Sequence, residues 1–331
     1  MKKSFVVTFF IFLLGFLPPS SYAKKVIYFS DKTEVKDFID FMNKVHGFDK
    51  AYLSRLFSVI QPNATVLRAI RPAAVPEQQR SWQRYRERFL NSRRTEGGIR
   101  FWHENEVVLQ RAETIYGVPA EFIVAIIGVE TEYGRNMGSF KVLEALASLA
   151  FYYPPRADFF RGELEQFMLM TRENHLDPLD VKGSYAGAIG IPQFMPGSQR
   201  RFAVDFDGDA LINLRHSVSD AIGSVGHFLQ QHGWQTGEPV AVPAHVEPSA
   251  SARFGIKPET TLQELAGQGV IASGDPQRLA ALVDLVTPDA ATEYWVGFEN
   301  FYVITRYNRS SFYAMSVFQL AEVLRAQRST H

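Results

Sequence analysis

The segment Phe122–Glu130 constrains the fold of this chain most strongly, because eight apolar or glycine residues lead directly into one carboxylate. On a helix, Ile123, Ile126 and Ile127 precede Glu130 by seven, four and three residues. These spacings place all four side chains on one helix face. The carboxylate of Glu130 therefore belongs to the buried stripe of a core helix.

A carboxyl group on an apolar helix face has unusual acid–base chemistry. Burial against aliphatic side chains disfavours the ionised form and raises the pKa of the group. An acid that stays protonated near neutral pH suits a general acid, for example one that protonates a glycosidic oxygen. The alternative is a buried glutamate held by an arginine or by backbone donors. Glu132, two positions further on, is expected to point the opposite way as ordinary surface charge.

Residues 1–23 have the pattern of a secretory leader, with a basic start, an apolar stretch and a small-x-small cleavage site at Ser21–Ala23. The chain has no cysteine, which excludes disulfides and a lipid-modified cysteine at the cleavage site. We therefore expect an exported, periplasmic, soluble protein that begins at Lys24. Basic and acidic residues number 35 each, a balance that leaves no electrostatic footprint for nucleic acid.

Apolar residues keep helical spacing through most of the chain as far as about residue 236. Gly97–Gly98 is expected to break the pattern between a helix at 81–91 and a further helix that ends near residue 116. After Gly237 the pattern changes. Strands are expected at 239–246, 282–286, 294–296 and 301–306, with a short helix at 261–266 and a closing helix from about residue 310.

These elements predict a mainly α chain of the α+β class. The expected parts are a leader at 1–23, an N-terminal helical domain at 24–108, a helical core at 109–236, a small β-containing domain at 237–300, and a C-terminal segment at 301–331 that returns to the core.

The segment Gly183–Pro196 contains three glycines, two alanines and two prolines. Small residues of this kind let a backbone approach a ligand closely, and the polar side chains of Ser184 and Gln193 offer directed hydrogen bonds. The Gly-Lys-Ser/Thr element of a phosphate loop is missing. A tight crossing of two helices is the alternative, although it explains Gln193 less well than the glycines.

The segment Asp205–Asn213 spaces oxygen atoms like a calcium-binding loop. Positions 1, 3, 5, 7 and 9 of such a loop are filled by Asp205, Asp207, Asp209, the carbonyl group of Leu211, and Asn213. Aspartates at alternate positions repel one another, and a cation relieves that repulsion. The spacing therefore predicts a structural Ca²⁺ ion.

Two positions of this loop depart from the calcium-binding pattern. Ala210 stands where glycine normally permits the turn, and His216 replaces the closing bidentate glutamate. Asp220 either closes the site from further along the chain or caps the helix that follows. The alternative to a calcium site is an acidic turn without a cation.

Tyr307 and Asn308 lie where the expected strand at 301–306 meets the closing helix, and such junctions expose side chains on a rigid scaffold. Other aromatic residues of this region are expected to fill the core. Tyr85, on the arginine-rich helix at 81–91, is ambiguous by itself.

Six motifs then stand in a specific order: Gly128–Thr131, Gly183–Ala188, Gln193–Pro196, Val204–Asp209, Asp220–Ser224 and Thr305–Asn308. Together they strongly resemble the lytic murein transglycosylase B family, from about Tyr85 to the C-terminus and more weakly before it. The resemblance implies a lysozyme-like helical core flanked by an α domain and a small β domain. It also implies cleavage of the β-1,4 bond from N-acetylmuramic acid to N-acetylglucosamine in peptidoglycan, with a 1,6-anhydromuramoyl end as the product.

The resemblance also assigns roles to single residues. Glu130 matches the single catalytic acid/base of the family. The residues that match its glycan groove are Tyr85, Ser184, Gln193, Tyr307, Asn308 and Tyr313. The residues that match its EF-hand-like metal site are Asp205, Asp207, Asp209, Leu211 and Asp220. Some members have glycine in place of Ala210 and tyrosine in place of Phe228.

The implied reaction needs only one carboxylate. A glycosidase with two carboxylates needs a second acid across the scissile bond, and Glu132 is expected on the wrong helix face. The N-acetyl oxygen of the substrate takes over that role in a substrate-assisted route. No cofactor is expected for catalysis. A lysozyme-type muramidase and a non-catalytic peptidoglycan-binding protein are the alternatives, and glycan strands are the expected partner. Cell wall synthesis or remodelling proteins are candidate further partners, and a monomer is expected.

Overall fold

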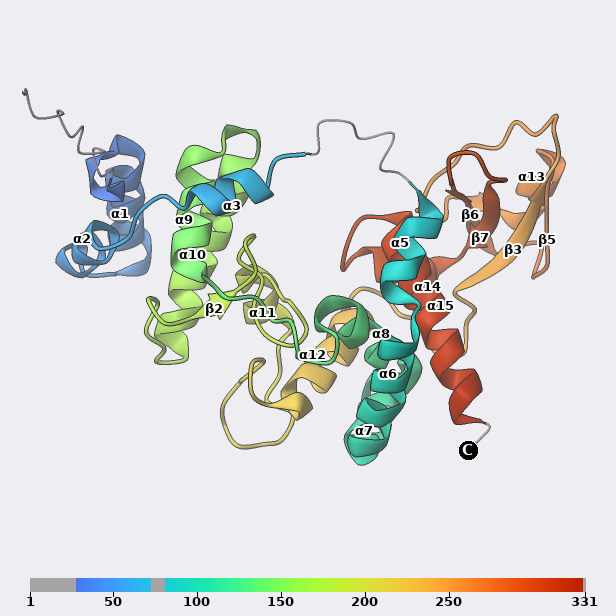
Figure 1. Ribbon diagram of the computed structural model, residues 1–331, viewed down its shortest axis with the longest axis horizontal. Helices are drawn as coiled ribbons and strands as arrows, with labels where there is room; N and C mark the ends of the chain where they lie inside the picture. Colours follow the sequence, from blue (N-terminus) through green and yellow to red (C-terminus); the bar gives the residue numbers. More distant parts are fainter. Residues whose placement is uncertain (1–27, 73–80, 330–331) are drawn as a thin grey trace, which may run out of the picture.

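The computed structural model describes residues 28–72 and 81–329, and helices dominate this part of the chain (Figure 1). The expected leader at 1–23 lies outside the described residues. Within those residues, no single helix combines the length and apolarity of a membrane span. Only the helices Glu106–Tyr116 and Ala120–Thr131 reach such a composition, as a pair that is bent by 113°.

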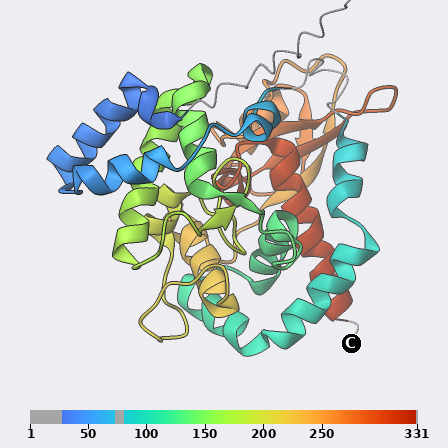
Figure 2. The same cartoon turned by 60° about the vertical axis from the view of Figure 1, so that its left-hand side comes forward.

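One group of helices gathers at the N-terminal end of the molecule. Its members are α1 (Thr33–His46), α2 (Lys50–Ser58), α3 (Ala64–Ala69), α9 (Val142–Tyr152) and α10 (Ala157–Glu173), with short 3₁₀ turns at Phe29–Asp31 and Pro154–Arg156. They share one buried apolar cluster, in which the rings of Phe29, Phe38 and Phe57 meet Phe151 edge to face. The first helices of the chain therefore pack against helices from its middle (Figures 1 and 2).

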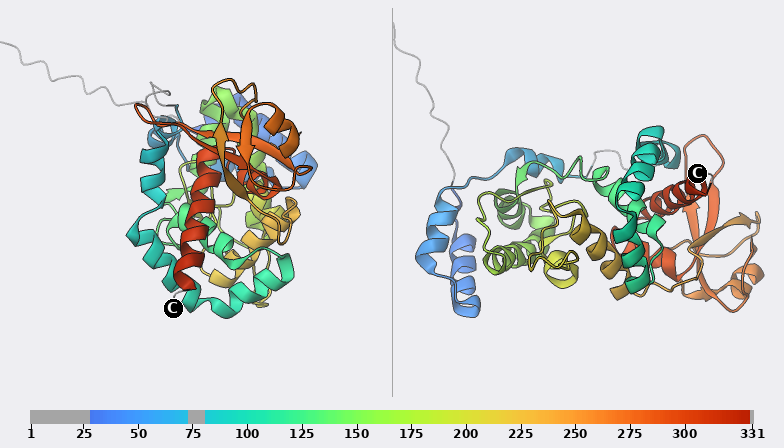
Figure 3. Two further views of the ribbon diagram at one scale, coloured as in Figure 1. Left: turned by 90° about the vertical axis from the view of Figure 1, so that its right-hand side faces the viewer. Right: turned by 90° about the horizontal axis from the view of Figure 1, so that it is seen from below.

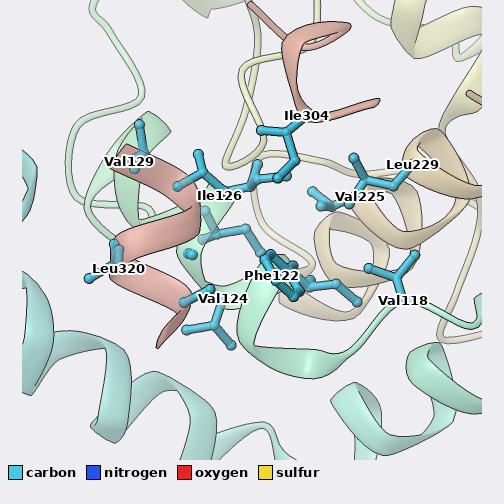
Figure 4. Packing of buried hydrophobic residues seen from close by; sticks show 14 of the residues in the cluster. Val118, Phe122, Val124, Ile126, Val129, Val225, Leu229, Ile304 and Leu320 are labelled. Carbon is cyan, nitrogen blue, oxygen red and sulfur yellow. The ribbon is translucent and has the colours of Figure 1, made fainter. Parts of the chain in front are cut away.

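A second, larger cluster forms the centre of the molecule around α8 (Ala120–Thr131). The other helices here are α5 (Trp82–Phe89), α6 (Ser92–Glu104), α7 (Glu106–Tyr116), α11 (Pro196–Phe202), α12 (Val218–Gln231), α14 (Glu299–Thr305) and α15 (Ser311–Arg328). Figure 4 shows side chains of α8 among those of the neighbouring helices, with Phe122, Val124 and Ile126 near Val225, Leu229, Ile304 and Leu320. The core helix expected from the apolar segment is confirmed, since α8 includes all of Phe122–Glu130.

The expected break at Gly97–Gly98 is wrong, because α6 runs through both glycines without interruption. Their role is close packing. A Cβ atom on Gly98 would lie 2.5 Å from the Tyr133 hydroxyl oxygen and 2.6 Å from a methyl carbon of Leu324. A Cβ atom on Gly128 of α8 would also lie 2.5 Å from the Tyr133 hydroxyl. The ring of Tyr133 therefore fills the space between α6 and α8 that these glycines leave free.

A five-stranded antiparallel sheet lies at the end of the molecule opposite α1 and α2 (Figures 1 and 3). Its strands are β3 (Ala241–Val246), β4 (Thr260–Thr261), β5 (Val270–Ala272), β6 (Leu279–Leu285) and β7 (Glu293–Gly297), in the order β4-β6-β7-β3-β5. The helix α13 (Leu262–Gly267) covers a small core of its own. A separate pair, β1 (Phe140–Lys141) and β2 (Lys182–Gly183), lies near α9.

The strand expected at 301–306 is wrong, since these residues form α14. The N–H of Phe298 donates to the carbonyl of Val240 and ends the pairing of the sheet. Phe301 and Ile304, one helical turn apart, are then both fully buried in the central cluster. Burial in the core therefore overrides the strand preference of aromatic and β-branched residues.

The sheet is an insertion whose first and last residues lie side by side. The Asn300 side chain accepts the N–H of Gln235 at 2.8 Å and donates to the carbonyl groups of Gln235 and Glu238. Asn300 is 1% exposed, so this clamp is buried. The predicted domain limits at 108/109, 236/237 and 300/301 stay predictions. Residues of α5, α6 and α7 belong to the same buried cluster as α8 at the centre of the molecule.

Candidate active site

Glu130 lies in the last turn of α8, where its side chain is partly exposed. Burial raises the pKa of this carboxyl group to about 7, and a hydrogen bond from Tyr313 opposes the rise. The hydroxyl of Tyr313, on α15, donates to Glu130 Oε1 at 2.6 Å. No other carboxylate of the described residues contributes to this pKa. Glu130 is therefore a single acid that exchanges its proton near neutral pH.

Three predicted site tyrosines surround this acid. Tyr313 comes from α15, Tyr307 from the turn between α14 and α15, and Tyr85 from α5. The rings of Tyr307 and Tyr313 stack with their centroids 6.4 Å apart. The pKa of each of the three phenols is raised, mainly by burial and in second place by the charge of Glu130. All three hydroxyl groups therefore stay protonated, and that of Tyr313 uses its proton in the hydrogen bond to Glu130.

Tyr307 links the C-terminal helices to the glycine-rich segment. Its hydroxyl donates to the carbonyl of Pro192 at 2.7 Å. The ring of Phe228, on α12, lies 4.7 Å from the ring of Tyr307 and 4.0 Å from His232. Phe228 is 4% exposed, so this ring supports Tyr307 from the core side.

The glycine-rich segment is held beside Glu130 by its neighbour Thr131. The hydroxyl of Thr131 donates to the carbonyl of Ile191 at 2.8 Å and accepts the N–H of Gly134 at 3.0 Å. The N–H of Ile191 in turn donates to the carbonyl of Leu214. The segment therefore bridges the end of α8 and the residues that follow the Asp-rich loop.

The predicted polar residues of this segment stabilise its own turns. The Gln193 side chain donates to the carbonyl groups of Gly190 at 2.8 Å and Met137 at 3.3 Å. Gln193 has a left-handed backbone with φ of 52°, and the residue is half-buried. Ser184 Oγ accepts the N–H of Ala188 at 3.0 Å. The segment is thus a set of bridged turns, not a helix crossing.

Asn308 is exposed, and its carbonyl accepts the N–H of Ser310 at 2.7 Å. Because 299–305 is helical, Tyr307 and Asn308 lie between two helices and not between a strand and a helix. The structure therefore groups Tyr85, Tyr307 and Tyr313 around Glu130. Ser184, Gln193 and Asn308 lie in the two segments that Tyr307 joins.

The expectation that Glu132 is surface charge is wrong, since this residue is 6% exposed. The helix ends at Thr131, and Glu132 takes a left-handed backbone with φ of 52°, so helical spacing no longer sets its direction. Its carboxylate forms ion pairs with Arg93 and, at 3.5 Å, with Arg135. Glu132 is therefore held as a structural anion.

The sequence patterns missed residues that hold the end of α8. Arg94 Nε donates to the carbonyl of Gly128 at 3.1 Å, and the hydroxyl of Tyr133 donates to the carbonyl of Arg94 at 2.8 Å. Both contacts join α6 to the turn that carries Glu130. The glycines at 97, 98 and 128 were the available signal, because they mark the space that Tyr133 occupies.

The three aspartates of the Asp-rich loop converge as predicted. Oxygen atoms of Asp205, Asp207 and Asp209 all lie within 4.8 Å of one another. Backbone N–H groups of residues 208 to 210 donate to Asp205, and the N–H of Leu211 donates to Asp209. Carboxylate oxygens of this kind are the ligands that a hard cation such as Ca²⁺ prefers. Leu211, whose carbonyl group is the predicted further ligand, is largely exposed.

Asp220 is not part of the converging group. Its two oxygens accept the N–H groups of Phe206 and Asn213, both at 2.8 Å, and the residue is 1% exposed. Its carboxylate thus holds the two arms of the loop together. The alternative that Asp220 caps α12 is wrong, because the capping side chain is that of Ser217. Ala210 has φ of 69°, the left-handed backbone for which glycine is suited.

Comparison with known proteins identifies relatives that cover most of the chain. The family model described as Transglycosylase SLT domain matches residues 30–322. The membrane-bound lytic murein transglycosylase B of Escherichia coli (strain K12) is 42% identical over 311 residues, which cover 91% of this chain and 85% of that protein.

Solved structures of lytic transglycosylases are also similar to most of this chain. The soluble lytic transglycosylase SltB1 from Pseudomonas aeruginosa has a TM-score of 0.84 and 46% identity, covering 89% of this chain and 99% of that one. The Escherichia coli lytic transglycosylase Slt35 in complex with calcium has a TM-score of 0.82 and 42% identity, covering 90% and 95%. SltB3 from Pseudomonas aeruginosa, in complex with NAG-anhNAM-pentapeptide, has a TM-score of 0.77 and 29% identity, covering 88% and 79%.

The family match spans nearly the whole described chain, and the relatives above are similar over most of their own length. The lysozyme-like helical fold expected from the sequence is confirmed. The chain belongs to the family of lytic murein transglycosylases with a transglycosylase SLT domain.

Proposed function

We propose that this chain cleaves the β-1,4 bond from N-acetylmuramic acid to N-acetylglucosamine in peptidoglycan and forms a 1,6-anhydromuramoyl end, with Glu130 as the only general acid/base. The observation that carries this proposal is the state of Glu130. It is a partly exposed acid with a pKa of about 7, and no second carboxylate of the described residues contributes to that value. A single group of this pKa suits both donation and acceptance of a proton at neutral pH.

The first step breaks the glycosidic bond. Protonated Glu130 gives its proton to the bridging oxygen, the C1–O bond breaks, and N-acetylglucosamine leaves with a hydroxyl group. The N-acetyl oxygen of the muramic acid stabilises C1 in place of a protein nucleophile. Positioned proton transfer of this kind accelerates a reaction on the order of 10²- to 10⁴-fold.

The second step returns the enzyme to its starting state. Ionised Glu130 takes the proton from the C6 hydroxyl of the same sugar, and O6 forms a new bond to C1 as the N-acetyl oxygen is released. No water molecule is consumed. The hydrogen bond from Tyr313 favours ionised Glu130 and so supports this step.

The tyrosines around Glu130 support a sugar-binding surface. Tyr307 stacks on Tyr313, which is only 3% exposed, so Tyr307 and Tyr85, both partly exposed, are the rings that offer flat apolar faces to a sugar in our proposal. Sugars pack their C–H faces on such rings and hydrogen-bond at their edges. Ser184, Gln193 and Asn308 extend this surface in our proposal, along the two segments that Tyr307 joins.

Glu130→Gln tests the assignment, because it keeps the shape of the side chain and removes its proton transfer. We expect turnover of purified peptidoglycan to fall by at least about 10²-fold while binding to sedimented peptidoglycan is retained. The matched control is Glu121→Gln, at the opposite end of the same helix, where a second glutamate is 8% exposed. Equal activity of the Glu130 variant and the wild type would refute the role of Glu130.

The product distinguishes the proposed reaction from its alternatives. Digestion in ¹⁸O-labelled water gives unlabelled anhydro ends by the proposed route, and labelled reducing ends by a muramidase route. Sedimentation of the wild-type protein with peptidoglycan, together with release of no soluble fragment, would identify a peptidoglycan-binding protein without activity.

We further propose a structural Ca²⁺ ion held by Asp205, Asp207 and Asp209, with the carbonyl group of Leu211 as a further ligand. The ion would neutralise the converging carboxylates and fix the loop between α11 and α12. It takes no part in the reaction of Glu130.

We also propose that the protein is exported to the periplasm and works there as a soluble monomer. The leader pattern of residues 1–23 supports export. Peptidoglycan strands, which lie outside the cytoplasmic membrane, are then the partner of the site, and proteins of cell wall synthesis or remodelling are candidate further partners. Mass spectrometry of the mature protein from its host tests this, because it should begin at Lys24.

A further inference from the structure

Arg94 is a half-buried cation in the first turn of α6 that is held without a carboxylate. Within the described part of the chain it forms no ion pair, and its neighbour Arg93 takes the carboxylate of Glu132 instead. Charged side chains are rarely withdrawn from water unless they are paired. The guanidinium is paired with two backbone oxygens, since Nε donates to the carbonyl of Gly128 at 3.1 Å and Nη1 donates to the carbonyl of Arg88. The two carbonyls belong to different helices, so Arg94 links α8 with α5.

The carbonyl of Gly128 lies in the turn of α8 that carries Glu130. It is one of the last carbonyls of the helix, which have no partner further along the helix itself. Its other donor is the N–H of Glu132, at 3.2 Å, in the turn where the helix ends. A cation near the C-terminal end of a helix also interacts favourably with the helix dipole. Arg94 therefore holds the backbone of α8 two residues before the proposed acid.

The carbonyl of Arg88 lies at the end of α5, the helix that carries Tyr85. The guanidinium carbon of Arg94 is 5.1 Å from the centre of the Phe89 ring, within the range of a cation–π contact. The ring of Phe89 in turn lies 5.1 Å from the ring of Tyr85. The charge of Glu130 contributes to the raised pKa of Tyr85, so this phenol is close to the acid. Arg94 therefore also holds the end of the helix that brings Tyr85 to the proposed site.

The backbone of Arg94 holds the chain on the other side of Glu130. Its carbonyl accepts the hydroxyl of Tyr133 at 2.8 Å. Glu132 and Tyr133 both have left-handed backbones, with φ of 52° and 61°, although neither residue is glycine. Strained backbone of this kind persists only where surrounding contacts determine it, and it gathers at functional sites. Arg94 thus contacts the chain two residues before Glu130 and three residues after it.

We propose that Arg94 is a positioning residue of the reaction, because its guanidinium fixes the end of α8 against the end of α5 and so sets the place of Glu130 relative to Tyr85. A planar guanidinium offers donors in fixed directions to two carbonyls at once, whereas the ammonium group of a lysine is a single point charge. Displacement of a catalytic group by about 1 Å lowers the rate by about 10²-fold. Arg94 is not among the groups that shift the pKa of Glu130, so its role is geometric. The inference rests on the proposed function.

Arg94→Lys keeps the positive charge and removes the planar link between the two helices. We expect kcat on purified peptidoglycan to fall about tenfold. Both limbs of the pH profile should stay in place, because Arg94 does not set the pKa of Glu130. Rates are compared well below the Tm of each variant, so that loss of folded protein does not contribute. Arg100→Lys, at an exposed arginine of the same helix, is the matched control and should leave kcat unchanged.

Chemical rescue supplies the second readout. Arg94→Ala should regain kcat when ethylguanidinium is added at concentrations that leave the Tm of the wild type unchanged, whereas ethylammonium should not restore it. Tyr133→Phe keeps the ring, removes only the hydrogen bond to Arg94, and should lower kcat in the same way but less. Wild-type kcat in Arg94→Lys overturns the inference, as do a shifted alkaline limb and rescue by both compounds or by neither. If the wild type releases no anhydro ends, the proposed function itself has failed.

Discussion

The hydroxyl of Tyr313 donates a 2.6 Å hydrogen bond to Glu130, and the two residues are 183 positions apart in the sequence. This contact joins α15 to the end of α8. It stabilises the ionised form of Glu130, whereas burial destabilises that form, and the balance gives a pKa of about 7. The proposed acid thus depends on a tyrosine from the last helix of the chain.

Tyr313→Phe removes this hydrogen bond and should raise the pKa of Glu130 further. The alkaline limb of the pH profile of kcat/KM is then expected to move to higher pH, because Glu130 stays protonated longer. At neutral pH we expect kcat to fall about tenfold, since the carboxylate needed for the second proton transfer is less stable. Tyr52→Phe, on the distant helix α2, should leave the profile unchanged. An unshifted alkaline limb in the Tyr313 variant would argue against this coupling.

The raised pKa of Glu130 also predicts how stability depends on pH. The ordinary pKa is 4.5 and the folded value is about 7, so the folded protein binds more protons than the unfolded chain between these values. The contribution of Glu130 to stability is therefore full below pH 4.5 and declines up to pH 7. Glu130→Gln removes this decline. The free energy of unfolding of the variant, relative to that of the wild type, should rise by at most about 3 kcal/mol between pH 4.5 and 8. Urea denaturation at several pH values measures this difference. A difference that does not change with pH would contradict the burial of this acid.

Calcium should stabilise the protein through the Asp-rich loop. At a calcium concentration of about 100 times Kd, binding adds about 2.7 kcal/mol to the free energy of unfolding. Addition of EDTA is then expected to lower the Tm measured by calorimetry, and Asp207→Asn should reduce this effect. Identical melting curves with and without EDTA, in protein first loaded with calcium, would exclude an occupied site.

Ala210→Gly should stabilise the same loop. A left-handed backbone costs an alanine about 1–2 kcal/mol, and Ala210 has φ of 69°. Glycine relieves that strain but loses more chain entropy on folding, so the expected net gain is about 0.5–1 kcal/mol. Denaturation in EDTA measures this gain without calcium. A loss of stability there would show that the alanine side chain makes contacts worth more than the strain.

Gly128→Ala should damage the packing that positions Glu130. Its Cβ atom would lie 2.5 to 2.9 Å from three atoms of Tyr133, and overpacking of this kind costs about 1–3 kcal/mol. Gly162→Ala is the matched control, because its Cβ atom on α10 meets nothing within 4 Å. That variant should gain up to about 1 kcal/mol from helix propensity. The difference between the two melting temperatures tests whether Tyr133 is fixed in place.

Regular patterns in the sequence predicted most helices and the site that they build. The apolar spacing before Glu130 identified a buried acid, and the alternate aspartates identified the loop at 205–213. Both signals are local, because each depends on residues within a few positions. Tyr307 was a candidate from its place before the closing helix, whereas the family resemblance added Tyr85 and Tyr313. The position of these tyrosines near Glu130 depends on contacts between distant helices.

The wrong predictions share one cause, since tertiary contacts override local patterns. Gly97 and Gly98 allow Tyr133 to approach and do not end their helix. Glu132 lies beyond the end of α8, so a helical projection gave the wrong direction. Residues 301–306 have strand-forming side chains, yet burial in the central cluster makes them helical.

The clamp of Asn300 on Gln235 and Glu238 has a consequence for how this molecule changes over evolution. The clamp fixes both ends of the β unit at one point of the helical centre, and Val283 and Leu285 of β6 pack in the same buried cluster as α15. Loops of the β unit that lie away from these contacts can therefore change in length with both ends of the unit, and α14 and α15 behind them, held in place.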